Sequence, residues 1–143
     1  LMSVRKINDG MSLYFCQKIL KLLNEKNINF KHSKILLLGL SFKENCPDIR
    51  NSKIFDLINE LKSFNVLLDI FDPIVNSEEV KKEFGLSVGT QPEIGKYDLI
   101  IIAVSHNFFK ELGIEKIRSW CKTDGSIMDL KSTFPQNHVD YTV

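Results

Sequence analysis

The sequence has few of the residues that usually mark a dinucleotide-binding or metal-binding chain. It contains seven glycines, and none of them form the G-x-G-x-x-G pattern of a dinucleotide-binding loop. The three cysteines are widely spaced, without the C-x-x-C pattern of a zinc knuckle, and their odd number argues against a disulfide framework. The histidines complete no ligand pattern with them. We therefore expect no metal site and a reducing, cytoplasmic environment.

Neither sign of charge is present in excess. The 143 residues include 19 basic and 18 acidic side chains, and a net charge of +1 gives no reason to expect nucleic acid or a membrane surface as partner. No apolar run approaches the ~20 residues needed to span a bilayer. The first ten residues, LMSVRKINDG, contain no signal-peptide core and do not begin with Met, so we expect a part excised from a longer protein.

What the chain does contain is an alternation of apolar runs and helical patterns. Four apolar runs predict strands, at 34–40, 66–71, 97–104 and 126–130. Four segments predict helices, at 8–27, 51–64, 77–84 and from 107 onward, and the tail is expected to be irregular. Asn51 or Ser52 should cap the second helix, and Ser77 the third. This order predicts one α/β domain, a Rossmann-like three-layer sandwich with a parallel sheet, preceded by a long N-terminal helix.

The segment GLSFKENCPDIRNS, residues 39–52, follows the first predicted strand and precedes a helix. In place of glycines it carries Lys43 and Arg50, at the sheet edge where open parallel sheets bind ligands. Two cations beside the positive end of a helix suit an anion, with Arg50 offering a planar fork and Lys43 a mobile point charge. Phe42 could pack on a base or on the sheet. The alternative interpretation is that both cations are solvated loop charges.

Other polar residues near the same edge have plainer interpretations. Asp72, before a proline, stands where a ribose-binding acid would lie, but a strand-terminating turn is favoured. Cys46 has no histidine near it in the sequence and is interpreted as incidental rather than nucleophilic. His106 is expected either to contact a ligand or to pack a loop, with packing favoured. Asp129 is expected to form a charge pair with Lys131.

These segments, in order, resemble one known family. INDGM at 7–11, LLLGLSFKENCPDIRNS at 36–52, FDP at 71–73, YDLIIIAVSHNFF at 97–109 and IMDLKS at 127–132 are similar to the C-terminal region of the UDP-glucose/GDP-mannose dehydrogenase family. The resemblance covers nearly the whole chain. ENCPD and AVSHNFF resemble the branch that acts on UDP-N-acetylhexosamines.

The resemblance implies a division of the chain and an activity. Residues 1–30 would be the end of a helical dimerisation core, and 31–143 a Rossmann-like UDP-binding domain. The family oxidises the C6 alcohol of a UDP-sugar to a carboxylate in NAD-dependent steps, here of UDP-N-acetylglucosamine or UDP-N-acetylgalactosamine for surface polysaccharide. Its catalytic cysteine and main NAD domain precede the matching segments, so the chain alone should be inactive.

The resemblance also assigns residues. Phe42 and Lys43 would contact the UDP-sugar, and Arg50 would reach across a domain cleft toward NAD. Lys131 stands where relatives often carry a nucleotide-binding arginine, keeping the charge but losing the fork. No catalytic residue and no metal ligand is expected. The implied partners are a UDP-sugar, NAD and a second copy bound through the N-terminal helix. Two alternatives stay open, a stand-alone nucleotide-binding α/β module and a purely structural dimerisation domain.

Overall fold

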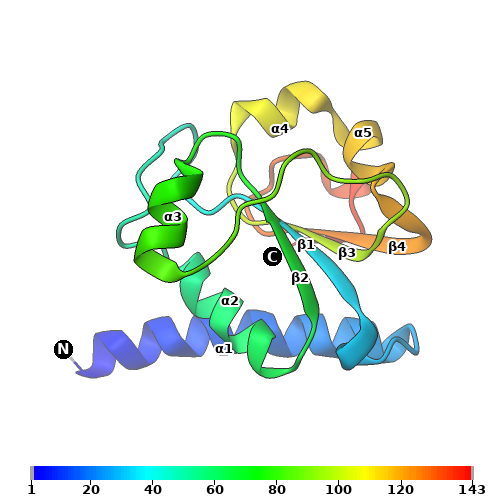
Figure 1. Ribbon diagram of the computed structural model, residues 1–143. Coiled ribbons are helices and arrows are strands. Elements are labelled where there is room, and N and C mark those ends of the chain that lie inside the picture. Colours follow the sequence, from blue (N-terminus) through cyan, green and yellow to red (C-terminus); the bar gives the residue numbers. More distant parts are fainter. Residues whose placement is uncertain (1, 143) are drawn as a thin grey trace.

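The centre of the molecule is a five-stranded parallel sheet with the strand order β2-β1-β3-β4-β5. The structure, a computed structural model, describes residues 2–142, with side chains from residue 13 onward. The strands are β1 (Lys34–Leu38), β2 (Leu67–Phe71), β3 (Tyr97–Ile102), β4 (Cys121–Asp129) and β5 (Tyr141–Thr142). The predicted α/β class and parallel sheet are thus confirmed (Figure 1).

The two central strands are buried on both faces, as their unbroken apolar runs predict. Leu37 of β1 lies in register with Ile101 of β3, and both contribute to one hydrophobic core. Leu36 and Ile100, one residue earlier on the same strands, contribute to a second core on the opposite face. The sheet therefore needs a helical layer on each side.

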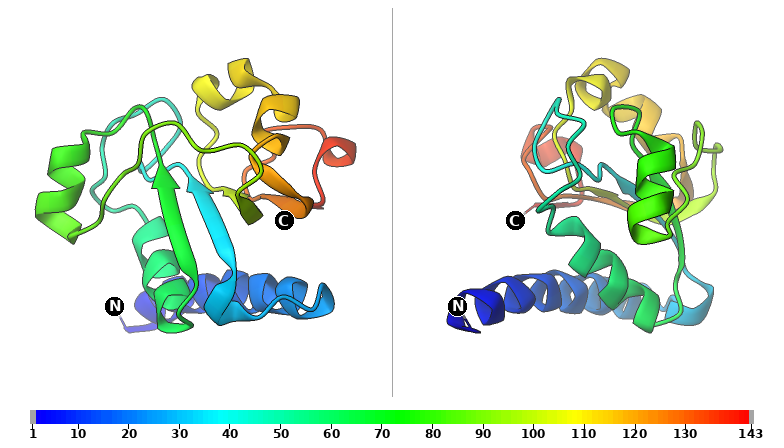
Figure 2. Two further views of the ribbon diagram at one scale, coloured as in Figure 1. Left: turned by 45° about the vertical axis from the view of Figure 1, so that its right-hand side comes forward. Right: turned by 60° about the vertical axis from the view of Figure 1, so that its left-hand side comes forward.

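The first face is covered by α1 (Met2–Glu25) and α2 (Ile54–Ser63), which lie together on one side of the sheet (Figures 1 and 2). Cys16, Ile19, Leu22 and Leu23 of α1 are buried in this core. Their helical spacing is the pattern that predicts a helix here. The INDGM segment at 7–11 also falls within α1, but its side chains lie outside the described residues.

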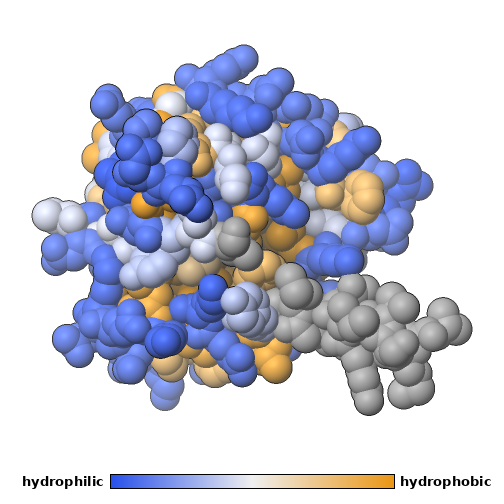
Figure 3. Space-filling model, turned by 180° about the vertical axis from the view of Figure 1, so that it is seen from behind, coloured by the Kyte–Doolittle hydropathy of each residue, from blue (hydrophilic) through white to orange (hydrophobic). Residues whose placement is uncertain are grey.

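The second face is covered by α4 (Asn107–Leu112) and α5 (Ile114–Arg118), which complete the three-layer sandwich (Figure 2). Phe109, Ile117 and Trp120 are fully buried beneath them. The remaining helix, α3 (Ser77–Phe84), follows β2, and its Phe84 ring stacks on Phe55 of α2 with centroids 3.6 Å apart. Seen from behind, hydrophilic residues cover much of this face, with hydrophobic patches between them (Figure 3).

Several boundaries differ from the sequence prediction. Two short 3-10 helices, η1 (Phe30–His32) and η2 (Gln136–His138), were not predicted. The tail expected to be irregular adds β5, and β4 begins at Cys121, inside the segment predicted to be helical. Asn76 rather than Ser77 caps α3, because its side chain accepts from the N–H groups of Glu78 and Glu79.

The predicted cap of α2 is also wrong. The helix begins at Ile54, and Lys53 occupies the cap position without a side-chain cap hydrogen bond. Asn51 adopts a left-handed turn with φ of 62°, and the Ser52 hydroxyl donates across the loop to the Ser41 carbonyl at 3.5 Å. Both residues therefore shape the loop before the helix. Within residues 2–142, no helix is long and apolar enough to cross a bilayer.

Candidate functional site

The order of the strands creates a crevice between the carboxyl ends of β1 and β3. The chain leaves β1 toward α2 on one face of the sheet and leaves β3 toward α4 on the other face. These two connections diverge at the point where the strand order reverses, and ligands bind at such switch points in open parallel sheets. The segment 39–53 forms one wall of this crevice.

Gly39 allows the two strand ends to approach each other closely. It has φ of +101°, and a Cβ atom added there would lie 2.6 Å from the Cβ of Val104 and 2.8 Å from its backbone nitrogen. The Gly39 N–H donates to the Phe71 carbonyl at 3.0 Å. The glycine is therefore required by packing between β1, β2 and the end of β3. It does not open the loop for a diphosphate.

The crevice holds a cavity of about 200 Å³ that is lined by both polar and apolar side chains. Its walls are Ser41, Phe42, Lys43, Glu44, Asn51, Ser52, Lys53, Ile54, Ala103, Val104, Ser105 and Lys131. The lining contains three lysines and one glutamate, so the cavity is positively charged and suits an anionic ligand. Phe42, one of the lining residues, is 57% exposed. Three segments distant in sequence therefore build one site.

Lys131 reaches this cavity from the turn after β4. Asp129 is fully buried, and its carboxylate accepts the backbone N–H groups of Lys131 at 3.3 Å and of Phe134 at 2.9 Å. These two bonds fix the turn that presents Lys131. The predicted charge pair between the two side chains is wrong, because the carboxylate is used by the backbone.

Arg50 does not line the cavity. Its guanidinium donates twice to the Asp48 carboxylate, with both distances 3.0 Å, and its side chain is 82% exposed. The hydrogen bond from Arg50 lowers the pKa of Asp48 below its ordinary value. The structure thus brings Phe42, Lys43 and Lys131 together around one cavity and leaves Arg50 outside it, held by its own neighbour.

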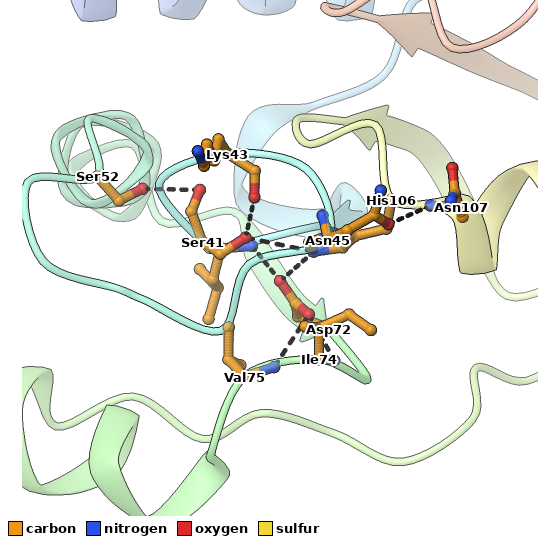
Figure 4. A network of polar contacts seen from close by, with 10 residues as sticks. Ser41, Lys43, Asn45, Ser52, Asp72, Ile74, Val75, His106 and Asn107 are labelled. Atoms are coloured by element: carbon orange, nitrogen blue, oxygen red, sulfur yellow. Dashed lines mark hydrogen bonds and ion pairs between the residues drawn. The ribbon is translucent and has the colours of Figure 1, made fainter.

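Asp72 and His106 form a buried pair beneath the loop (Figure 4). Asp72 is 3% exposed and accepts from the N–H groups of Leu40 at 2.7 Å and Ile74 at 2.9 Å. Burial alone would raise the pKa of Asp72, but the hydrogen bonds from His106 and Leu40 outweigh it and lower that pKa. The carboxylate is saturated by the protein, which confirms the turn-forming interpretation. His106 is fully buried and packs the loop.

The cysteines offer no activated nucleophile at this site. All three are free thiols. Burial raises the pKa of Cys16 and of Cys121 to about 11, so both stay protonated near neutral pH. Cys46 is half-buried in the 39–53 loop and is not among the residues that line the cavity. Among the described residues, no group of three or more potential metal ligands gathers at one point.

A larger cavity, of about 460 Å³, lies beside β2 and under the loop that connects α3 to β3. Its charged residues are of both signs, and Asp69 is already bound there by the Tyr97 hydroxyl at 2.6 Å and by Lys96 at 3.2 Å. It lies away from the switch point between β1 and β3. A larger volume alone does not identify a binding site. We therefore place the functional site in the smaller, positively charged cavity.

Sequence reasoning missed several residues of that cavity. Ser41, Lys53 and Ser105 line it, and Asn45 holds the loop beside it. A usable signal was present, because Ser41 and Ser105 closely follow the apolar runs of the two central strands. Residues in that position share one edge of a parallel sheet.

The fold and the cavity together define an α/β domain with a positively charged cavity at a sheet switch point. Residues 36–136 match the family model described as "UDP-glucose/GDP-mannose dehydrogenase family, UDP binding domain". The chain belongs to this family, and the resemblance read from its motifs is confirmed.

Named relatives agree with this membership. The UDP-N-acetyl-D-glucosamine 6-dehydrogenase of Salmonella typhi is 41% identical over 140 residues, which are 98% of this chain and 33% of the relative. The enzyme of the same name from Pseudomonas aeruginosa is 39% identical over 140 residues, again 98% of this chain and 33% of the relative. The chain therefore spans about a third of the length of these curated relatives.

Solved structures confirm the fold. The crystal structure of an NDP-N-acetyl-D-galactosaminuronic acid dehydrogenase from Methanosarcina mazei Go1 matches with a TM-score of 0.81 at 18% identity, over 96% of this chain and 28% of that protein. A UDP-D-ManNAc dehydrogenase from Pyrococcus horikoshii matches with a TM-score of 0.74 at 24% identity, over 92% of this chain and 29% of that protein.

Proposed function

We propose that this chain is the UDP-sugar-binding part of an NAD-dependent nucleotide-sugar 6-dehydrogenase. The observation that carries the proposal is the positively charged cavity at the switch point, where Lys43, Lys131 and Phe42 meet. The full protein would oxidise the C6 alcohol of UDP-N-acetylglucosamine or UDP-N-acetylgalactosamine to a uronate for surface polysaccharide. The two UDP-N-acetyl-D-glucosamine 6-dehydrogenases among its relatives support the first of these sugars.

In this proposal the cavity binds the nucleotide through charge rather than through a glycine loop. Lys43 and Lys131 stand on different segments of its wall and offer ammonium groups to a diphosphate. The exposed ring of Phe42 offers a surface for the uracil base. Closure of another domain over this edge would exclude water and strengthen the charge contacts.

The chain's own residues do not fit a dinucleotide site at β1. The loop after β1 lacks the G-x-G-x-x-G pattern, Gly39 packs closely against Val104, and Asp72 is saturated by the protein. NAD, which would accept the hydride, is therefore assigned to a domain outside this chain. Arg50, with its exposed guanidinium, is the residue proposed to reach that cofactor across the cleft.

The catalytic nucleophile is likewise assigned to the rest of the protein, and the chain alone is proposed to be inactive. The raised pKa values of Cys16 and Cys121 support this, because a thiol must ionise to attack. The free thiols also support the proposed cytoplasmic location, where disulfides are rare.

Residues 1–30 are proposed to end a helical dimerisation core, with the UDP-binding domain at 31–143. On α1, Leu13 and Tyr14 are 44% and 45% exposed, although one face of the following turns is buried in the core. Large apolar side chains left exposed on a helix suit a partner surface. A homodimer through α1 in the full protein accounts for them.

The proposal is tested by calorimetric titration of the 143-residue chain with UDP and, separately, with NAD. We expect weak binding of UDP and no heat from NAD. Lys43→Ala should weaken UDP binding by about tenfold, the effect of losing one charge-assisted contact. The matched control is Lys82→Ala, which removes the same charge from an exposed position on α3 and should leave UDP binding unchanged.

Sedimentation of the same samples separates the alternatives. A stand-alone module would be a monomer that binds UDP without any larger protein. A purely structural domain would be a dimer that gives no heat with UDP at millimolar concentration, and that result would contradict the proposal. In the complete enzyme, Lys43→Ala should raise KM for the UDP-sugar more than it lowers kcat.

A further inference from the structure

The loop that carries Phe42 and Lys43 rests on a buried histidine. His106 follows β3 and directly precedes α4, and its side chain is fully buried. Its Nδ1 accepts the backbone N–H of Asn45 at 2.9 Å, and its Nε2 lies 3.0 Å from Asp72 Oδ2 (Figure 4). The imidazole therefore connects the end of β2 to the tip of the loop.

These contacts fix the protonation of the ring. Because the Asn45 N–H donates to Nδ1, that nitrogen carries no proton. The Asp72 carboxylate, whose pKa is lowered, accepts from the Nε2–H. The ring thus uses Nδ1 as the acceptor for Asn45 and Nε2 as the donor to Asp72.

The loop is also fastened on both sides of Lys43. The Ser41 hydroxyl donates to the carbonyl of Lys43 at 2.9 Å, and the Asn107 N–H donates to the side-chain oxygen of Asn45 at 2.8 Å. Asn45 itself adopts a left-handed conformation with φ of 60°, which its contacts with His106 and Asn107 hold in place. The backbone that presents Lys43 therefore depends on the His106 ring and on residues bound to it.

Asp72, His106 and Ser41 have the composition of a nucleophilic triad but not its geometry. Ser41 Oγ lies 3.4 Å from Nε2, the same nitrogen that faces Asp72. In a triad the acid and the nucleophile contact opposite nitrogens. Ser41 is 1% exposed and donates to the backbone, so the three residues support the loop and do no covalent chemistry.

We propose that His106 is a positioning residue for the nucleotide site. Its unprotonated Nδ1 holds the Asn45 N–H, and through that bond the loop keeps Lys43 and Phe42 at the cavity. This inference rests on the proposed function, since it names what orients the residues that hold the diphosphate. His106 touches no ligand in this role, because it is fully buried and does not line the cavity.

Two substitutions separate the two bonds of the ring. In His106→Asn, the amide oxygen stands near the place of Nδ1 and can accept from Asn45, while the bond to Asp72 is lost. In His106→Gln, the amide nitrogen stands near the place of Nε2 and can donate to Asp72, while the acceptor for Asn45 is lost. Both variants remove the ring, so a merely structural role would affect them alike.

The test compares UDP affinity, thermal unfolding and hydrogen exchange of a peptide covering 41–46. We expect His106→Gln to bind UDP about tenfold more weakly and to exchange faster in this peptide. His106→Asn should bind within about threefold of the unaltered chain and keep its protection. Equal losses of affinity in both variants, following their melting temperatures, would overturn the proposal, as would full affinity in His106→Gln.

Two further readouts keep the result decisive. If the unaltered chain binds no UDP, the proposed function fails, but the exchange contrast between the two variants still decides the role of His106. If neither variant folds, Asn45→Gly keeps the left-handed turn and removes only the side-chain bond to Asn107 at an exposed position. If hydrogen exchange and UDP affinity are unchanged in Asn45→Gly, the contacts of Asn45 do not hold the loop, which would count against the proposal. Faster exchange together with weaker UDP binding would support it.

Discussion

Gly39→Ala is expected to destabilise the protein strongly. The new Cβ would stand 2.6 Å from the Val104 Cβ and 2.8 Å from its backbone nitrogen, and φ of +101° is a conformation that side chains disfavour. Because β1 and β3 are the central strands, neither can move aside without disturbing both cores. We expect a loss of ~3 kcal/mol or more, with a melting temperature lower by about 10 °C.

Gly85→Ala is the matched control for this prediction. Gly85 follows α3 with φ of +69°, and a Cβ there meets no atom within 4 Å. It therefore has the strain of a positive φ without the overlap, and should cost about 1 kcal/mol. Chemical denaturation of both variants measures the difference. Equal losses would mean that backbone strain, and not the close approach of β1 to Val104, explains Gly39.

Asp72→Asn is expected to have the second largest effect. The buried carboxylate accepts from Leu40, Ile74, Val75 and His106, and an amide in its place would set an NH₂ group against at least one of these donors. Leaving buried donors unpaired should cost ~2–4 kcal/mol near pH 7. Asp124→Asn, at an exposed position of β4, is the control and should change stability by less than about 0.5 kcal/mol.

The effect of Asp72→Asn should depend on pH in a defined direction. The pKa of Asp72 is lowered in the folded protein from an ordinary value of 3.8. A carboxyl with a lowered folded pKa stabilises the fold fully above its unfolded pKa, and this contribution is lost as the pH falls through the folded one. The gap in stability between the unaltered chain and Asp72→Asn should therefore be constant above about pH 5 and shrink below pH 3.8. A gap that widens in acid would contradict the assignment.

The sheet could be predicted from the sequence because its central strands are buried on both faces. Unbroken apolar runs such as ILLL and LIII leave no polar residue for solvent, and their alternation with helical patterns favours a parallel sheet between two helical layers. The edge strand β5 could not be predicted in the same way. It has two residues, Tyr141 and Thr142, and its existence depends on pairing with Met128 and Asp129 rather than on its own pattern.

The charges of the site were predictable, but their arrangement was not. Lys43, Phe42 and Lys131 follow strands whose carboxyl ends meet at one edge, so their convergence follows from topology. The place of Arg50 depends instead on a local competition, because Asp48 lies two residues away and accepts both arms of its guanidinium. That His106 packs a loop was expected, but its hydrogen bond to the Asn45 N–H depends on where the buried ring lies, which no spacing in the sequence reports.

The pairing of Arg50 with Asp48 has a consequence for any anion that approaches it. Asp48 occupies one edge of the guanidinium, and the other edge of this exposed side chain keeps its N–H donors. A phosphate arriving at that free edge would still meet Asp48 nearby as a like charge, which reduces the net attraction. We therefore expect Arg50 to favour an oxyanion of higher charge that accepts two hydrogen bonds from the free edge.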